Sequence, residues 1–529
     1  MSCSKIYDVL LKNLKIVDGT CAPAFYGNIG IKGDTIIDVG KTDGQAVTEI
    51  DCEGLVAAPG FIDIHNHSDE VVFLEPNARN YTTQGVTTLV VGNCGVSGAP
   101  VSEKNKKDLA EVEKYSEINI NWPTFKDYIR DLETTKKAVN IAALVGHGNI
   151  RGFVMGVEDR EPTTGEMEKM KALAREAMES GAYGMSSGLI YDPGVFAKKP
   201  ELIELAKVIA RYDGIYATHI RNESDLLVDA VMEAIEVAKN SGVRLELSHH
   251  KASGKRNWGL VRTTLDLMQY YRRLGLEITC DVYPCTYCST DLYSFFPNWT
   301  RQGGKKAFLS LIKNEENRNK IKHQLTRPSR DWENILLDCG FDELIIASSK
   351  KLKNYEGKNA AAIANELNMN PYDALFYIIE NDPDIMVIAG GMCEEDVKYV
   401  LKHPLSMVGS DGYITRLGEG TVHPRSYRAF TKVLSKYVNK ENELSLEYAV
   451  AKMSHYPALK LGIGDRGLLK RGFKADIAVF DMWQVDYVSE FNDPHHYSKG
   501  MVHVMVNGEF AIRDEHFTQN LPGMVLKRN

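Results

Sequence analysis

The chain has 529 residues, 71 of them acidic and 63 basic, which gives a formal net charge of −8 at pH 7. Hydrophobic residues make up 43% and charged residues 25%, values typical of globular proteins, and a chain of this length can bury a sizeable core without disulfides. It contains no block of Lys or Arg and no apolar run of about 20 residues, so we expect neither nucleic-acid nor membrane binding.

Both ends of the chain show the alternation of apolar and polar residues that is typical of half-exposed β-strands. The pattern covers residues 1–57 and returns in residues 466–529, where Asp476–Asp481 and Met501–Val506 are the clearest runs. Two β-rich ends around a different middle predict one small β-sandwich domain that is built from both termini.

The middle of the chain, residues 58–465, alternates short apolar runs with segments of helical periodicity. The clearest amphipathic segments are 166–180 and 225–241. Eight buried strands that alternate with helices predict an α/β fold, a TIM-like (β/α)8 barrel. The eight runs are Val56–Ile64, Val86–Val91, Ile141–Val145, Tyr183–Ser187, Ile215–His219, Val243–Ser248, Ile278–Tyr283 and Ser406–Gly409.

One gap in this rhythm predicts an insertion. The seventh and eighth runs are separated by 123 residues, counted from Tyr283 to Ser406, whereas a βαβ unit needs only about 30. We therefore expect an inserted segment at about residues 290–385. A segment that follows a barrel strand lies at the C-terminal face, where active sites are found, so a lid is predicted. The alternative is a solvated structural appendage.

Six residues that can bind a metal ion lie at the predicted carboxyl ends of five strands. In His65-Asn-His67, residues i and i+2 of a strand point to the same side, so both imidazoles would face the barrel mouth. Each residue alone could be a hydrogen-bonded core residue. Six at these positions indicate a site, because barrel enzymes gather catalytic residues there. They are His65, His67, Cys94, His219, His249 and Asp411.

The motifs around these residues resemble those of the N-acyl-D-amino-acid deacylases (D-aminoacylases), a family of the metal-dependent amidohydrolase superfamily. The resemblance covers nearly the whole chain, and GDRGLLKRGFKADIAVFD is similar to the closing strand motif of the superfamily's β-sandwich. The other motifs are PGFIDIHNHSD, GVTTLVVGNCG, YGMSSGLIYDPG, YATHIRNE, LSHHKASG, DVYPC, MVGSDG and HPRSY.

The resemblance implies one tightly bound zinc ion and leaves open a second, weaker one. His250 is an alternative to His249, although the family pattern Ser-His-x-Lys selects His249. By this assignment Cys94, His219 and His249 hold the tight ion, and His65, His67 and Asp411 bind the other.

The activity that the resemblance implies is hydrolysis of the amide bond of N-acyl-D-amino acids, which gives a carboxylate and a free D-amino acid. Metal-bound hydroxide would be the nucleophile and Asp411 the general base and acid, although Asp411 also suits a helix N-cap. A cyclic amidohydrolase of the hydantoinase or dihydroorotase type is the first alternative; it would use a carboxylated Lys where this chain has Cys94. A catalytically inactive scaffold is the second.

The small-molecule substrate carries a free carboxylate, which needs cationic or hydroxyl donors. Lys251 lies two residues after His249 and would share its face if the strand continues. Arg425 follows the eighth predicted strand, while Tyr191 and Tyr283 occupy positions similar to the family's near the fourth and seventh; each could instead be a surface residue.

Two further expectations concern the surroundings of the site. Arg221 and Glu223 are predicted to form an ion pair beside His219. Cys285 stands where the family usually has Tyr, so the pocket would be wider or of different polarity.

The cysteines also bear on cofactors and location. An odd count of nine, scattered along the chain, favours reduced thiols and a cytoplasmic protein. The spacing of Cys280, Cys285 and Cys288 is similar to that of ferredoxin ligands, but Cys280 lies inside a predicted strand, so we expect no iron–sulfur cluster. The sequence does not indicate an oligomeric state.

Overall fold

The computed structural model describes residues 6–42, 44–104 and 120–528, so the first five residues of the predicted terminal domain lie outside it. Within these ranges, eight parallel strand segments follow one another around a ring. Each corresponds to one of the eight predicted runs. They are β6 (Phe61–Asp63), β7 (Val86–Val91), β8 (Asn140–Ala143) with its continuation β9 (Val145–Gly146), β10 (Gly184–Gly188), β11 (Ile215–His219), β12 (Arg244–Leu247), β13 (Ile278–Val282) and β17 (Ser406–Val408).

Hydrogen bonding closes this ring. β6, β7 and β8 pair in that order, and β9 leads on through β10, β11, β12 and β13 to β17. Only Leu144 separates β8 from β9. A parallel bridge between Asn66 and Gly412 joins the ends of β6 and β17. The chain therefore has the predicted α/β fold, and the carboxyl ends of all eight strands meet at one face.

Amphipathic helices surround the ring and cover its outer surface with the largest hydrophobic core of the protein. The two segments predicted from periodicity are α5, which begins with a capping box between Thr163 and Glu166, and α7, which ends at Gly242 in a left-handed conformation. The helices are α1 (Arg79–Thr82), α3 (Phe125–Thr134), α4 (His147–Met155), α5 (Thr164–Glu179), α6 (Lys199–Ala210), α7 (Leu227–Ser241), α8 (Leu260–Arg273), α15 (Glu394–Lys402), α16 (Arg425–Lys432), α17 (Leu446–Met453) and α18 (His455–Leu461). None of the helices in the described ranges is long and apolar enough to cross a bilayer.

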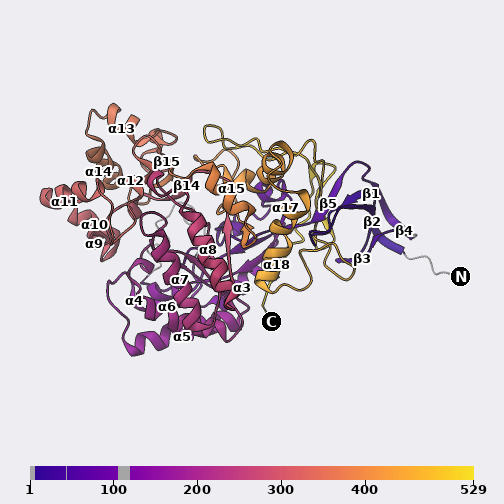
Figure 1. Cartoon of the computed structure of the whole chain (residues 1–529), viewed down its shortest axis with the longest axis horizontal. Helices are drawn as coiled ribbons and strands as arrows, with labels where there is room; N and C mark the ends of the chain where they lie inside the picture. Colours follow the sequence, from indigo (N-terminus) through magenta and orange to yellow (C-terminus); the bar gives the residue numbers. More distant parts are fainter. Residues whose placement is uncertain (1–5, 43, 105–119, 529) are drawn as a thin grey trace.

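Strands from both ends of the chain form one nine-stranded sheet at one end of the molecule (Figure 1). Its order is β21-β20-β19-β18-β5-β1-β2-β3, and β4 pairs with β1. The strands are β1 (Ile6–Ile16), β2 (Phe25–Lys32), β3 (Thr35–Gly40), β4 (Gln45–Asp51), β5 (Val56–Pro59), β18 (Ile477–Phe480), β19 (Met501–Val506), β20 (Glu509–Arg513) and β21 (His516–Phe517). A short C-terminal strand, β22 (Val525–Leu526), pairs with β8 of the ring.

The first predicted run, Val56–Ile64, is divided between the two sheets. Its first half is β5, which pairs with β18, and its second half is β6 of the ring. Gly60 separates them: its N–H donates to the carbonyl of Asp476, and a Cβ here would lie 2.3 Å from Thr87 Oγ1. The prediction of one continuous strand is therefore wrong, because packing against Thr87 makes the chain change sheets at this glycine.

Between β13 and α15 the chain forms a separate group of elements at the end opposite to the nine-stranded sheet (Figure 1). Its three strands are antiparallel in the order β14-β16-β15, and its helices enclose a hydrophobic core of their own. The elements are β14 (Cys288–Asp291), α9 (Asn298–Arg301), α10 (Gly304–Leu311), α11 (Glu315–Leu325), α12 (Ile335–Cys339), β15 (Leu344–Ser348), α13 (Ala360–Glu366), α14 (Pro371–Asn381) and β16 (Met386–Ala389).

Candidate active site

Four of the six predicted ligands form a compact buried cluster at the carboxyl ends of the ring strands. The ligating atoms of His65, Cys94, His249 and Asp411 all lie within 4.8 Å of one another. Cys94 Sγ is 3.3 Å from His65 Nε2 and 3.4 Å from His249 Nε2. Ligand atoms bound to one tetrahedral zinc ion are separated by about 3.3–3.7 Å. The sulfur, nitrogen and oxygen donors therefore fit a zinc ion.

The other two predicted ligands adjoin this cluster. His67 Nε2 lies 3.0 Å from Asp411 Oδ1, and His65 Nε2 lies 3.5 Å from the same oxygen. The His219 ring is 4.4 Å from the His249 ring, and neither of its buried nitrogens has a hydrogen-bond partner among the described residues. Such nitrogens are costly unless something binds them. The structure thus brings all six predicted ligands together.

Three of these ligands have a left-handed backbone. The φ angles are 51° at Cys94, 36° at His249 and 51° at Asp411. Non-glycine residues rarely adopt this conformation, and it is often retained at functional sites. The three side chains therefore project from tight turns just beyond the strands.

The expected strand geometry of His65 and His67 is wrong. β6 ends at Asp63, so the two residues do not lie on the strand. Their rings are nevertheless 5.3 Å apart, and both reach Asp411. They converge because the chain bends after β6, where Asn66 pairs with Gly412.

Asp281, a residue that the sequence analysis did not single out, orients two of the ligands. Its Oδ2 lies 3.2 Å from His65 Nδ1, and its Oδ1 accepts the backbone N–H of His249 at 2.9 Å. A carboxylate behind a metal-binding imidazole fixes the orientation of the ring and raises its basicity. The signal in the sequence was an acidic residue within the buried strand β13.

Glu223 contacts two residues of the site. Its Oε1 lies 3.0 Å from His249 Nδ1, and both carboxylate oxygens accept from Lys251 Nζ at 2.7 Å. The predicted ion pair between Arg221 and Glu223 is wrong: Arg221 pairs with Glu233 on α7, with its Nε 2.9 Å from Oε2. The Glu223 carboxylate is drawn instead to the buried ammonium group of Lys251.

The predicted substrate-binding residues lie around the cluster. The Tyr283 ring has the Arg425 guanidinium 4.8 Å and the Lys251 ammonium 5.6 Å from its centre. Arg425 also pairs with Asp411 at 2.7 Å. The Tyr191 ring is 5.0 Å from the His219 ring, and its hydroxyl accepts from Thr290.

A cavity of about 430 Å³ adjoins the cluster, and its size is that of a small-molecule site. The predicted ligands His67, Cys94, His219, His249 and Asp411 line one wall, together with all four predicted substrate-binding residues. Another part of its lining comes from the segment between β13 and α15. It includes Thr290, Tyr293, Arg301, Glu333 and Met386.

The electrostatic surroundings favour an ionised Asp411 and neutral imidazoles at His219 and His249, whereas at His65 the Asp281 carboxylate and Cys94 outweigh burial and raise the pKa well above its ordinary value. Burial by itself would raise the pKa of Asp411, but the Arg425 guanidinium and His249 outweigh it and hold this pKa well below its usual range. Burial holds the pKa of His219 and His249 well below the ordinary value, and Lys251 adds to the effect at His249. Neutral imidazole is the form that binds metal ions.

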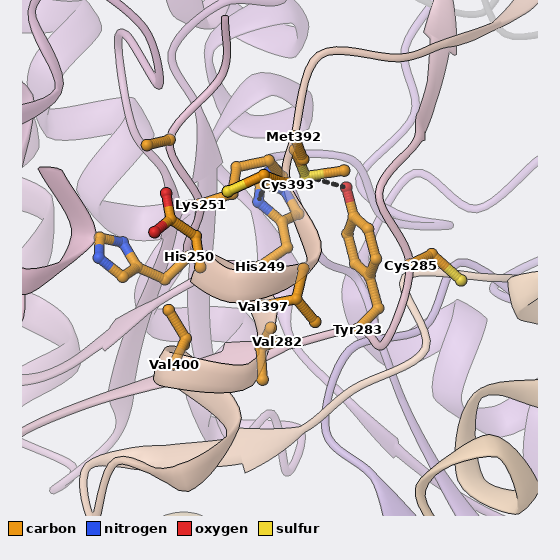
Figure 2. Close-up of a pocket in the computed structure, with 12 residues that line it drawn as sticks. His249, His250, Lys251, Val282, Tyr283, Cys285, Met392, Cys393, Val397 and Val400 are labelled. Carbon is orange, nitrogen blue, oxygen red and sulfur yellow. Dashed lines mark hydrogen bonds between the residues drawn. The ribbon is translucent and has the colours of Figure 1, made fainter. Parts of the chain in front are cut away.

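His250 and Cys285 face away from this cavity. Figure 2 shows the His250 ring pointing to the opposite side from the His249 ring, and His250 Nε2 lies 2.7 Å from Thr264 Oγ1 on α8. Cys285 lines a second cavity of about 10 Å³ and is not one of the described residues that line the large one. The exchange of the family's Tyr for Cys285 thus lies behind Tyr283 rather than in the wall of the large cavity.

Comparison with known proteins gives consistent matches over the whole chain. The amidohydrolase family matches residues 48–253 and 379–512. Two curated proteins of Alcaligenes xylosoxydans xylosoxydans are each 32% identical to this chain. The match to an N-acyl-D-aspartate deacylase covers 98% of this chain and 95% of the relative. The match to a D-aminoacylase covers 100% of this chain and 99% of the relative. A crystal structure of N-acyl-D-glutamate deacylase from Bordetella bronchiseptica, complexed with zinc and a phosphonate mimic of the tetrahedral intermediate, is 31% identical. It covers 99% of this chain and 100% of its own with a TM-score of 0.84.

Proposed function

The chain belongs to the amidohydrolase family, within it to the N-acyl-D-amino-acid deacylases, and we propose that it is a zinc-dependent hydrolase of N-acyl-D-amino acids. The reaction cleaves the amide bond and gives a carboxylate and a free D-amino acid. The observation that carries this proposal is the buried cluster of sulfur, nitrogen and oxygen donors beside a cavity that Lys251 and Arg425 also line.

Two groups of ligands are proposed. The donor types support zinc, which thiolate and imidazole bind well. The buried nitrogens of His219 support a ligand at that ring, because neither has a hydrogen-bond partner among the described residues and Nε2 lies 3.7 Å from Glu223 Oε2. When bound, a zinc ion supplies a nucleophile at neutral pH and polarises the scissile carbonyl. We assign Cys94, His219 and His249 to one tightly held ion, which the contacts of Cys94 and of the His219 ring with His249 support. His65, His67 and Asp411 are assigned to a second, weaker site, which the contacts of both imidazoles with Asp411 support.

Asp411 is proposed to move the proton. The Arg425 guanidinium keeps its carboxylate ionised, so Oδ1 is ready to accept a proton from the attacking water. The same oxygen then returns the proton to the departing nitrogen, which leaves as an amine. His67 and Arg425 hold the carboxylate from both sides, through Oδ1 and Oδ2, and so fix its direction.

The substrate carboxylate is proposed to bind between Lys251 and Arg425, with the hydroxyls of Tyr191 and Tyr283 nearby. Both cations line the cavity and lie next to the Tyr283 ring, which supports a site for an anion. Each is already paired with a carboxylate, Lys251 with Glu223 and Arg425 with Asp411. A substrate carboxylate would therefore join existing ion pairs rather than meet isolated cations.

We also propose the domain division expected from the sequence. A β-sandwich would comprise residues 1–57 and 466–529, supported by the shared nine-stranded sheet and its own core. A barrel of residues 58–465 would carry a lid at about 290–385 after the seventh strand; the cavity residues that this segment supplies support that role. A cytoplasmic location stays a prediction.

The alternatives are less well supported by the site. A cyclic amidohydrolase would use a carboxylated Lys to bridge two ions, whereas here the sulfur of Cys94 lies between His65 and His249. This favours linear amides. An inactive scaffold would be expected to have lost ligands, yet all six gather at one face of the ring.

Hydrolysis of a substrate panel tests the proposal. We expect the purified protein to contain at least one zinc ion per chain and to cleave N-acetyl-D-amino acids faster than their L enantiomers. Amine release and metal content are the measurements, and a hydantoin and dihydroorotate are assayed in parallel. Cleavage of the cyclic amides alone, or a protein without bound zinc, would contradict the proposed activity.

A further inference from the structure

One buried carboxylate of the segment between β13 and α15, which also lines the large cavity, contacts the backbone of Glu223. Glu333 Oε2 accepts the backbone N–H of Glu223 at 2.8 Å, and Glu333 is only 6% exposed. We propose that Glu333 is a positioning residue, which holds Glu223 so that its carboxylate orients His249 and Lys251. The expected effect of Glu333 on turnover rests on the proposed function, whereas its expected effect on metal binding does not.

The backbone on either side of Glu333 is held firmly. Trp332 is 6% exposed and belongs to the core of this segment. Asn334 caps α12 by accepting the N–H of Leu337, and its amide nitrogen donates to the carbonyls of Leu325 and Arg327 at 2.9 Å. Glu333 therefore projects from a rigid turn, as a residue that fixes the position of another must.

Residue 223 is clamped from two directions. Its N–H donates to Glu333, and its carbonyl accepts the N–H of Ser253, in the loop after β12, at 2.8 Å. With its backbone fixed, the carboxylate of Glu223 reaches His249 Nδ1 at 3.0 Å and Lys251 Nζ at 2.7 Å. Glu333 thus acts on the metal ligand through a single intermediate residue.

A second contact joins the loop that contains Glu223 to the segment between β13 and α15. Asp338 on α12 accepts from the hydroxyl of Ser224 at 3.0 Å and pairs with Arg256 at 2.8 Å. Gly254 leaves room for it, since a Cβ there would lie 2.4 Å from Asp338 Oδ1. Two neighbouring residues, Glu223 and Ser224, are thus held by two carboxylates that lie five residues apart in the chain.

The chemistry of Glu333 suits a neutral acceptor. Burial raises its pKa well above the usual range, and the carboxylates of Glu223 and Asp338 add to the effect. A neutral carboxyl group still accepts a hydrogen bond through its carbonyl oxygen. Glutamine has a carbonyl oxygen at the same place on its side chain. Glu333→Gln therefore keeps the hydrogen-bond acceptor and removes the ionisable group.

The test compares Glu333→Ala with Glu333→Gln. Cobalt(II) replaces zinc as the probe, because a cobalt complex of Cys94 and the imidazoles absorbs visible light. We expect Glu333→Ala to raise the Kd for cobalt about 10-fold, the lower end of the effect of losing an outer-sphere partner of a metal site. Its spectrum should change as His249 loses its fixed orientation, and kcat should fall by a similar factor. Glu333→Gln should restore the Kd, the spectrum and kcat.

Asp382→Ala is the matched control. Asp382 is a buried carboxylate of the same segment, but it accepts from Ser349 and from the N–H of Lys350 instead of Glu223. Its loss should lower thermal stability without changing the cobalt spectrum. The proposal is overturned if Glu333→Ala binds cobalt as the native protein does, or if Glu333→Gln is as damaged as Glu333→Ala. If no N-acyl amino acid is hydrolysed but the cobalt results hold, the proposed function fails and the role of Glu333 stands.

Discussion

Replacing His249 with Ala is expected to remove zinc and activity together. The His249 ring lies beside both Cys94 and His219, so its loss deprives the tight site of its central ligand. The fall in kcat/KM should exceed the roughly 100-fold effect of losing an outer-sphere partner, because a ligand itself is lost. Metal content of the purified variant and its hydrolysis rate, measured on the same preparation, check this result. His219→Ala should behave in the same way.

His250 provides the control for this prediction. It is the adjacent residue, carries the same ring and is equally buried, but its Nε2 bonds Thr264 on α8. His250→Gln should retain zinc and most of the activity. A His249→Ala protein with full zinc content, or loss of zinc from His250→Gln instead, would show that the ligand is assigned to the wrong histidine.

Asp411→Asn is expected to separate metal binding from turnover. Asn has nearly the same shape, and Cys94, His219 and His249 remain, so the tightly held ion should stay. The amide cannot take up a proton, and general acid–base catalysis contributes about 10²–10⁴-fold, so kcat should fall within that range. Zinc stoichiometry and kcat at saturating substrate are the two measurements.

The matched variant for Asp411 is Asp396→Asn. Asp396 is also a buried carboxylate, but it accepts the N–H of Gly259 and is not one of the described residues that line the large cavity. Its kcat should remain close to that of the native protein. Full activity of Asp411→Asn would eliminate the role of this carboxylate in proton transfer.

The sequence predicts most of the framework because its signals are local. Each β-branched run contains a ring strand, and the excess length between β13 and β17 predicted the inserted elements. The six predicted ligands lie close together because they follow strand ends, which converge in any closed parallel ring.

What the sequence could not predict depends on contacts between distant residues. Asp281 and Glu223 resemble ordinary acidic residues until folding places them against His65 and His249. Glu333 is harder still to predict, since it lies 110 residues along the chain from Glu223, whose backbone N–H it accepts. The left-handed turn at Cys94 is likewise set by packing, because no local residue type demands it.

The glycine at which the chain passes from one sheet to the other has a consequence for the metal ligands. His65 comes only five residues after Gly60, and β5 on the other side is paired with β18 from the C-terminal part of the chain. A slip of one residue in that pairing would turn the side chains of β5 to the opposite faces of its sheet. Gly60 alone separates β5 from β6. The pairing of β5 with a strand more than 400 residues further along the sequence thus helps to fix the place from which the segment with the first imidazole starts.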